Sequence, residues 1–211
     1  MPGRNRSNAV RQRLSYEAAR IMAEQGLADY EAARRKAAER LGVADRKQWP
    51  KNNEIQTALL EHQRLFRPRE QASVLRRMRE EAVGVMRALQ RFRPRLVGPA
   101  LDGTADSYSG IRLHLFVDST EEIVLELMER GLHWQQLDLS LLYAGGQRKI
   151  RPALRLHAHD VAVELVLLPV VDLRNPPLSR VTERPERGAG VEQVRALLDG
   201  EAEQQAGNLA R

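Results

Sequence analysis

The stretch from Leu96 to Asp118, LVGPALDGTADSYSGIRLHLFVD, decides the fold that we expect for this chain. Its first apolar run ends at Gly98, small and polar residues follow, and a β-type run then begins at Ile111. A strand that ends at a glycine, a loop and a second strand form a phosphate-facing turn in several nucleotide-binding folds. Glycine also ends ordinary tight turns, so the stretch alone predicts a strand–loop–strand unit and no chemistry.

Helical periodicity dominates the chain before this stretch. Apolar residues recur at three- and four-residue spacing, which predicts helices from about Asn8 to Gly26, Asp29 to Leu41, Asn52 or Asn53 to Phe66, and Glu70 to Gln90. The second of these helices carries a narrow alanine face that suits close packing between helices. Residues 1–8 precede the first periodic position, and we expect them to be disordered.

Strand patterns dominate the chain after it. We expect strands over residues 96–100, 111–117, 137–143, 150–157 and 161–168, with a helix from Ser119 or Thr120 to Gly131, where Ser119 and Glu122 form a capping box. The last strand is apolar on both sides, which indicates that both of its faces are covered. An extended arm over residues 170–190, a short helix Val191–Leu198 and a loose tail from Gly200 should follow.

This order of elements predicts an α+β fold, in which an N-terminal helical region precedes a mixed β-sheet with helices packed on it. We divide the chain into a disordered start (1–8), a basic helical region (9–68), an α+β core (69–170), and an arm with a short helix and a loose tail (171–211).

The net charge of +6 is unevenly distributed. Residues 1–95 carry 22 Lys+Arg against 11 Asp+Glu, which is +11, and the remainder carries 12 against 17, which is −5. Arginine binds phosphate in a planar, bidentate way, so the basic half predicts contact with RNA or another polyanion. Arg-rich helices that simply face solvent, as a GC-rich genome would encode, stay open as the alternative. The cations that we expect to bind a polyanion are Arg34, Arg35, Lys36, Arg40, Arg76, Arg77 and Arg79.

Composition narrows the class of protein. The chain has no cysteine, which excludes disulfides and thiolate metal sites. No apolar run approaches the roughly 20 residues that span a bilayer, and the first residues lack the apolar core of a signal peptide. We therefore expect a cytoplasmic protein of bacterial type with no membrane contact.

The central stretch also carries a spaced motif. Val97, Gly98 and Pro99 are followed by ten residues and then by Gly110-Ile111-Arg112-Leu113. This spacing resembles the nucleotidyltransferase superfamily, the fold of DNA polymerase beta and CCA-adding enzymes, over residues 70–170. The family pattern is an apolar residue, Gly, then Gly or Ser, about ten residues, and Asp, an apolar residue, and Asp or Glu.

The resemblance implies a site whose chemistry has changed. In the family the two carboxylates, with a third on a later strand, hold two divalent cations. Here the two positions are Gly110 and Arg112, and the guanidinium cannot lose its proton to relieve repulsion of a cation. Pro99 has no N–H to offer a phosphate. The third carboxylate corresponds to Glu164, for which an ion pair with Arg112 is the expected partner, with solvent or a metal as alternatives.

Other residues leave further chemistry open. Asp102, Asp106 and Asp118, with Glu164, are the candidate catalytic carboxylates of a rearranged site, and magnesium is expected only if such a site forms; otherwise we expect no cofactor. His114, His157 and His159 could bind zinc only if they converge.

Three hypotheses follow. The first is a nucleotidyltransferase-like pseudoenzyme that binds RNA or another polyanion through its basic N-terminal helices. The second is an active nucleotidyltransferase with a rearranged metal site. The third is a protein-interaction module whose alanine-rich helices bind a protein partner. The sequence does not decide whether the protein is an enzyme.

Overall fold

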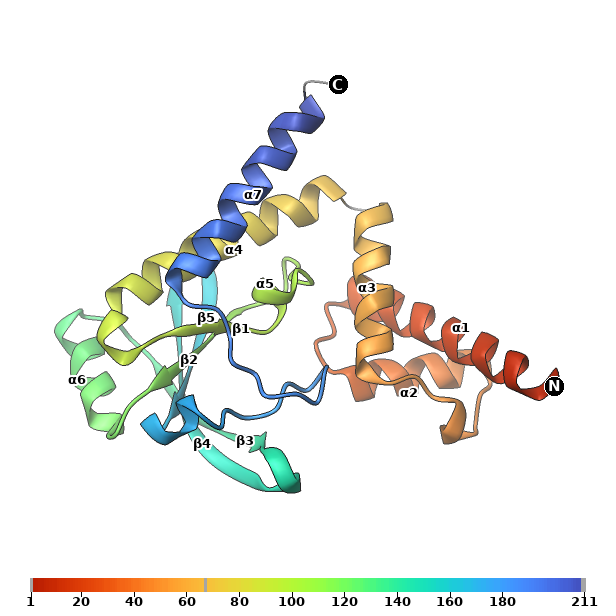
Figure 1. The fold of residues 1–211 in the computed structure, drawn as a ribbon, viewed down its shortest axis with the longest axis horizontal. Helices are drawn as coiled ribbons and strands as arrows, with labels where there is room; N and C mark the ends of the chain where they lie inside the picture. Colours follow the sequence, from red (N-terminus) through yellow and green to blue (C-terminus); the bar gives the residue numbers. More distant parts are fainter. Residues whose placement is uncertain (1, 67, 210–211) are drawn as a thin grey trace. The chain divides into compact units, whose positions relative to one another are not determined.

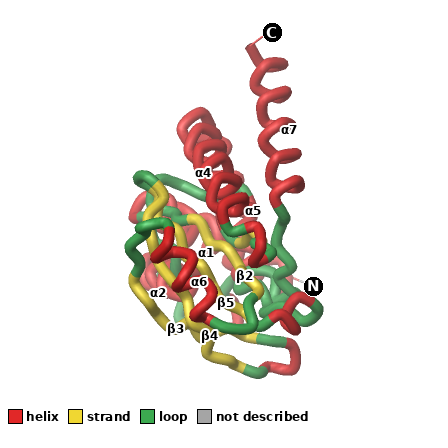
Figure 2. The backbone as a smooth tube through the Cα atoms, turned by 90° about the vertical axis from the view of Figure 1, so that its left-hand side faces the viewer, coloured by secondary structure: helices red, strands yellow, loops and turns green. Residues whose placement is uncertain are grey.

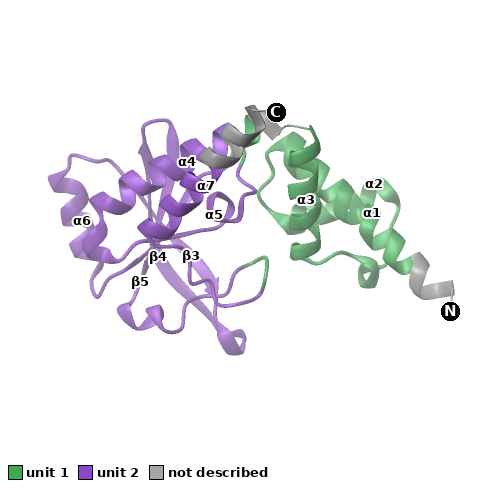
Figure 3. Cartoon of the chain, turned by 45° about the horizontal axis from the view of Figure 1, so that its top comes forward, with its two compact units in different colours: residues 1–72, 106–109, 180–182 green, residues 73–105, 110–179, 183–211 purple. Residues whose placement is uncertain are grey.

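The structure, a computed structural model, describes residues 2–66 and 68–209. The chain divides into two compact units (Figure 3), with the change at Ala72 rather than at the expected residue 68. Unit 1 holds Met1–Ala72, Asp106–Ser109 and Arg180–Thr182, and unit 2 holds Ser73–Ala105, Gly110–Ser179 and Glu183–Arg211. Within the described residues, no helix has both the length and the apolar character that crossing a lipid bilayer requires.

Unit 1 is built from three helices and a short 3₁₀ turn. These are α1 (Pro2–Gln25), α2 (Tyr30–Leu41), η1 (Arg46–Gln48) and α3 (Asn52–Phe66) (Figure 1). Asp29 begins α2, because its Oδ1 accepts a hydrogen bond from the Glu31 N–H at 2.8 Å. Gly42 ends α2 at a φ of 67°, a conformation that favours glycine.

The core of unit 1 depends on the alanine face of α2. Ala33, Ala37 and Ala38 are buried there, and they belong to one apolar cluster with Leu14 and Ile21 of α1. Small side chains let the helix axes approach closely, which the sequence predicts. Ile55, Ala58 and Leu59 of α3 complete the cluster.

Unit 2 contains a five-stranded mixed sheet, drawn in yellow in Figure 2. The strand order is β1-β2-β5-β4-β3; β2 and β5 are parallel, and every other neighbouring pair is antiparallel. The strands are β1 (Arg95–Val97), β2 (Ile111–Phe116), β3 (Gln135–Leu142), β4 (Arg148–Ala158) and β5 (Val161–Leu168). The predicted α+β fold is confirmed.

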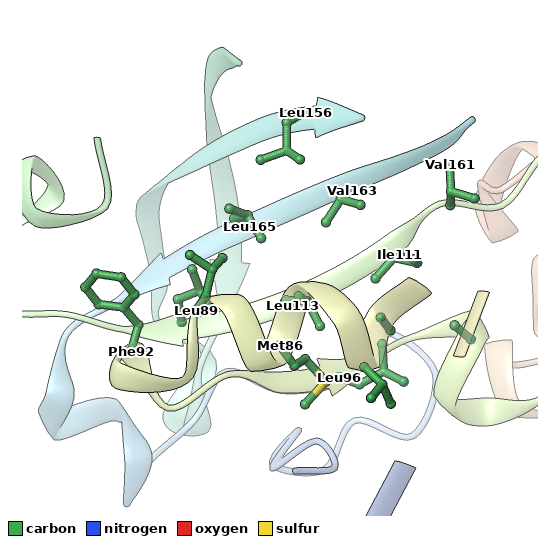
Figure 4. Packing of buried hydrophobic residues seen from close by; sticks show 14 of the residues in the cluster. Met86, Leu89, Phe92, Leu96, Ile111, Leu113, Leu156, Val161, Val163 and Leu165 are labelled. Carbon is green, nitrogen blue, oxygen red and sulfur yellow. The ribbon is translucent and has the colours of Figure 1, made fainter. Parts of the chain in front are cut away.

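One face of the sheet carries the main core of unit 2. Met86 of α4 (Pro68–Ala88), and Leu89 just after that helix, pack with Leu113 of β2 and Leu165 of β5 (Figure 4). The helices α6 (Thr120–Glu129) and α7 (Val191–Leu209) add Ile123, Leu127 and Val194 to this cluster.

The other face of the sheet is divided into two zones. Phe116, Val166 and Leu168 form an apolar zone that is packed by the 3₁₀ turn η4 (Val170–Leu173) and by leucines of β3. The first half of β5 instead carries Ala162 and Glu164, both partly exposed, on this face. β5 is therefore covered on both sides only along its second half, and the first half leaves room for charged residues.

Three local expectations need correction. Residues 96–100 do not form one strand, because β1 ends at Val97 and α5 (Pro99–Asp102) follows Gly98. Residues 2–8 belong to α1 rather than to a disordered start, with Pro2 in the first turn, where a missing N–H costs nothing; Met1 lies outside the described residues. The tail is not loose from Gly200 to Leu209, because α7 continues through this stretch, which is rich in good helix formers.

The start of α6 also differs in detail from the expected capping box. Ser119 precedes the helix but makes no side-chain bond to its main chain. Its hydroxyl hydrogen-bonds the Glu121 carboxylate instead. The helix position was right and its capping contact was wrong.

Candidate functional site

The turn between β1 and β2 begins at Gly98, which has φ 72° and ψ −154°. No atom lies within 4 Å of the point where a Cβ would stand, so the backbone angle alone selects glycine here. Pro99 then starts α5, at a position that tolerates a residue without an N–H. The Gly98 carbonyl accepts hydrogen bonds from the N–H groups of Leu101 and Asp102, both at 2.9 Å. The turn is therefore closed by its own main chain.

Gly110 stands where the family resemblance implies a metal-binding carboxylate. A Cβ at this residue would lie 2.9 Å from the carbonyl oxygen of Ala162, closer than real Cβ atoms approach main-chain oxygen. The close approach of two main chains therefore requires glycine. An aspartate at position 110 could be accommodated only if the backbone shifted.

Arg112, Glu164 and Arg155 form a charged cluster on three neighbouring strands. Glu164 on β5 stands opposite Arg112 on β2 and opposite Arg155 on β4. Arg112 Nε donates to Glu164 Oε1 at 2.6 Å, and Arg155 Nη2 donates to Oε2 at 3.1 Å. The Glu164 side chain is 12% exposed, whereas the arginines are 39% and 49% exposed. The predicted Glu164–Arg112 ion pair is confirmed, and Arg155 is a further partner that strand patterns alone did not reveal.

The electrostatics of this cluster favour the ionised carboxylate. Burial raises the pKa of Glu164, but Arg112 and then Arg155 lower it by more, so the pKa lies below its ordinary value. Two guanidinium groups surround one carboxylate, and both of its oxygens accept hydrogen bonds from arginine. This arrangement attracts an anion more readily than a metal cation.

The remaining candidate carboxylates lie elsewhere. Asp102 at the end of α5 and Asp118 after β2 are exposed. Asp106 belongs to unit 1, where its Oδ1 accepts hydrogen bonds from the Tyr108 N–H and the Ser109 hydroxyl. Among the side chains described, those of residues 7–66 and 70–201, no three His, Asp or Glu are grouped so that they could hold a metal ion.

The three histidines singled out in the sequence have separate surroundings. His159 Nδ1 lies 3.0 Å from Glu81 Oε2, and His157 is exposed on β4. His114 is buried in β2, and its Nδ1 has no hydrogen-bond partner among the described residues. Burial, and then the charge of Arg112, lower the pKa of His114 to about 4, although Glu164 acts in the opposite direction. Glu186 Oε2 lies 4.0 Å from His114 Nε2, beyond hydrogen-bond distance.

We expect the buried His114 to make unfolding easier in mild acid. The unfolded chain binds a proton on this histidine near pH 6.5 and the folded chain only near pH 4, so stability falls as pH drops through that window. The contribution amounts to about 2 kcal/mol lost between pH 7 and pH 5. Urea unfolding at these two pH values measures it.

The variant His114→Leu should remove this pH dependence. The lowered pKa of Glu164 reduces stability only when the pH falls below the ordinary pKa of a glutamate. A comparison between pH 7 and pH 5 therefore isolates the contribution of His114. If the wild type and His114→Leu lost the same free energy of unfolding between pH 7 and pH 5, the pH dependence would come from groups other than His114.

The cations predicted to face a polyanion separate into three groups. Arg79 is buried and donates to the Ala100 carbonyl, so its assignment to polyanion binding is wrong. The helical period explains this, because Arg79 stands between Leu75 and Ala82 on the inner stripe of α4. Four further cations are ion-paired with carboxylates: Arg34, Arg40, Arg76 and Arg77.

The third group consists of predicted cations that have no carboxylate partner, and three further cations in and after η1 share this property. Arg35 and Lys36 on α2 are exposed, and so are Arg46, Lys47 and Lys51. Among the side chains that the structure describes, none of the five has a carboxylate within ion-pair distance. We call them the unpaired cations of unit 1.

Contacts around η1 fix the main chain at Lys47 and the side chain of Arg46. Arg11 Nη2 donates to the Lys47 carbonyl at 3.0 Å, which ties η1 to α1. The Arg46 guanidinium lies 5.2 Å from the centre of the Trp49 ring, a cation–π contact. The Trp49 Nε1 donates to the Val43 carbonyl at 3.2 Å, so this half-buried ring serves the fold.

No protein-family model matches the chain, and no curated protein matches it either. The residues and their geometry therefore carry the functional proposal.

Proposed function

We propose that this protein binds RNA through the unpaired cations of unit 1, and that unit 2 is a nucleotidyltransferase-like fold without two-metal catalysis. The observation that carries the first part is the set of five exposed cations, Arg35, Lys36, Arg46, Lys47 and Lys51, with no carboxylate in ion-pair distance among the described side chains. Their charge is available to phosphate groups, whereas an ion-paired arginine must first leave its carboxylate.

The same residues indicate the kind of recognition. Lysine and arginine contacts to phosphate give affinity without reading the bases. Trp49 would be the natural platform for a stacked base, but its ring is half-buried and its Nε1 hydrogen-bonds Val43. We therefore propose binding that depends on phosphate charge and shows little sequence preference.

Two features support the loss of catalysis. Gly110 offers no ligand, and its close approach to Ala162 leaves no room for one. Arg112 places a fixed positive charge beside the remaining carboxylate, Glu164, at 2.6 Å. A divalent cation at that point would meet repulsion of several kcal/mol even at the effective dielectric constant of about 20 that suits protein sites.

Removing three of the unpaired cations should weaken RNA binding. We expect the triple variant Arg46→Ala, Lys47→Ala, Lys51→Ala to bind a fluorescent single-stranded RNA more weakly at low salt. The slope of log K against log salt should become shallower by about 2, since each phosphate contact with a single strand contributes roughly 0.7. Fluorescence anisotropy between about 50 and 200 mM salt measures both quantities.

A matched variant controls for net charge. Arg87→Ala, Arg148→Ala and Arg174→Ala remove the same charge from exposed positions of unit 2 and should leave the slope unchanged. Equal effects of the two triple variants, or no binding at the lowest salt, would defeat the RNA proposal. Transfer of label from a nucleoside triphosphate in the presence of Mg²⁺ or Mn²⁺ would instead defeat the proposed loss of catalysis.

A further inference from the structure

The last strand of the sheet, β3, has an open edge. On one side β3 pairs with β4. Tyr143 directly follows β3, and its N–H points toward β4 and donates to the Gln147 carbonyl. The Leu142 carbonyl points the other way and accepts the Leu178 N–H at 2.6 Å. Because the direction alternates along an antiparallel strand, the main-chain groups of Gln136, Asp138 and Ser140 also point away from β4. Among the described residues, nothing hydrogen-bonds to these groups.

The side chains of β3 do little to discourage pairing at this edge. Natural edge strands are protected by lysines, prolines, bulges or inward charges. β3 has eight residues, and Asp138 is its one charged residue. On one face, Leu137, Leu139 and Leu141 are only half-buried against the apolar zone around Phe116, so a neighbouring strand could cover them further.

The sequence of β3 complements itself in one antiparallel register. With a two-fold axis at Leu137, Gln136 of one copy stands opposite Asp138 of the other, and the two can exchange both main-chain hydrogen bonds. The Gln136 amide can also donate to the Asp138 carboxylate. A register centred on Asp138 would place two like charges face to face. A register centred on Leu139 would bring Gln136 of the second copy against Leu142, where Leu178 already lies.

We propose that the outer edge of β3 pairs with β3 of a second copy of this chain, antiparallel about Leu137, so that one sheet continues through both copies. The proposal is independent of RNA binding. The paired segment is short and buries less than a standard interface, so we expect a reversible dimer with a Kd of about 10 μM. Leu137 of the two copies would then meet across the axis.

Sedimentation velocity of the full chain without RNA, from about 1 to 300 μM, tests the dimer. The wild type should move from monomer to dimer across this range. Asp138→Pro should remain a monomer, because it removes an outward-facing N–H that β4 does not use. Circular dichroism of the variant checks that its fold is retained.

Exposed polar substitutions test the register without disturbing the fold. Gln136→Glu places two carboxylates opposite each other and should weaken the dimer about tenfold, whereas Gln136→Lys should strengthen it severalfold. Ser140→Glu lies outside the Gln136–Asp138 pair and should have little effect. The proposal would be overturned by a wild type that stays monomeric up to 300 μM, or by a dimer whose affinity the Gln136 and Asp138 variants leave unchanged. It would also be overturned if β3 bound an extended peptide in place of a second copy.

Discussion

Replacing Arg79 with alanine should lower the free energy of unfolding by about 3–5 kcal/mol, the usual cost of breaking a buried ion pair by removing one partner. The Arg79 side chain is 6% exposed, and its Nε and Nη2 donate to the carbonyls of Ala100 and Leu101 at 2.9 and 3.1 Å. Its remaining nitrogen pairs with Glu201 on α7, whose other carboxylate oxygen is buried without a partner. The variant removes the donors of three acceptors, of which the Ala100 carbonyl is buried and the Leu101 carbonyl and Glu201 carboxylate are partly buried. Urea unfolding followed by circular dichroism measures the loss.

The neighbouring arginine provides the matched control for Arg79. Arg77 lies on the same helix, but it is 57% exposed and meets Asp160 at 3.4 Å. Arg77→Ala should change stability by no more than about 0.5 kcal/mol. Arg79→Lys keeps the charge but cannot reach all three acceptors, so its loss of stability should lie between those of Arg79→Ala and Arg77→Ala. Similar losses for both alanine variants would show that the buried network is not the cause.

Glu164→Ala should lower the free energy of unfolding by about 2–3 kcal/mol, the second large effect, because two charge-assisted hydrogen bonds disappear and two guanidinium groups lose their shared carboxylate. The partial exposure of Arg112 and Arg155 keeps this effect below that of Arg79. Glu80→Ala, which removes an exposed pair with Arg76 on α4, should cost no more than about 0.5 kcal/mol.

A double-mutant cycle assigns the loss to the pair. Arg112→Leu and Glu164→Leu, alone and together, should give a coupling energy above about 1 kcal/mol if the two side chains stabilise each other directly. Additive losses would mean that Glu164 matters for the packing of β5 and not for its contact with Arg112.

Much of the fold could be predicted from local pattern. β5 begins and ends where its alternating apolar residues do, at Val161 and Leu168, and α2 ends at Leu41 before Gly42 as its glycine signal indicates. The break at Gly98 was harder, because Leu96 to Ala100 is apolar throughout. Only the positive φ of Gly98 separates its strand from the helix that follows.

The candidate site could be predicted only in part, for reasons of register. Glu164 was expected to pair with Arg112 because a carboxylate in an apolar strand needs a partner, and the family resemblance puts Arg112 on a neighbouring strand. The pairing of Arg155 with the same carboxylate depends on how β4 aligns with β5, which no local pattern specifies. Arg79 was misassigned because its charge was given more weight than its place on the inner stripe of α4.

The strand order also has a consequence for how unit 2 folds. β3, β4 and β5 form a meander of sequence neighbours, so their contacts need only short loops to close. The join between β2 and β5 instead brings together residues 52 positions apart, such as Arg112 and Glu164. Chain closure over that separation costs more entropy, so the meander can form before β1 and β2 pair with it. Until β1 and β2 dock, the edge of β5 that will pair with β2 also has free main-chain groups. A nascent chain would therefore expose two unpaired strand edges, those of β3 and β5, rather than one.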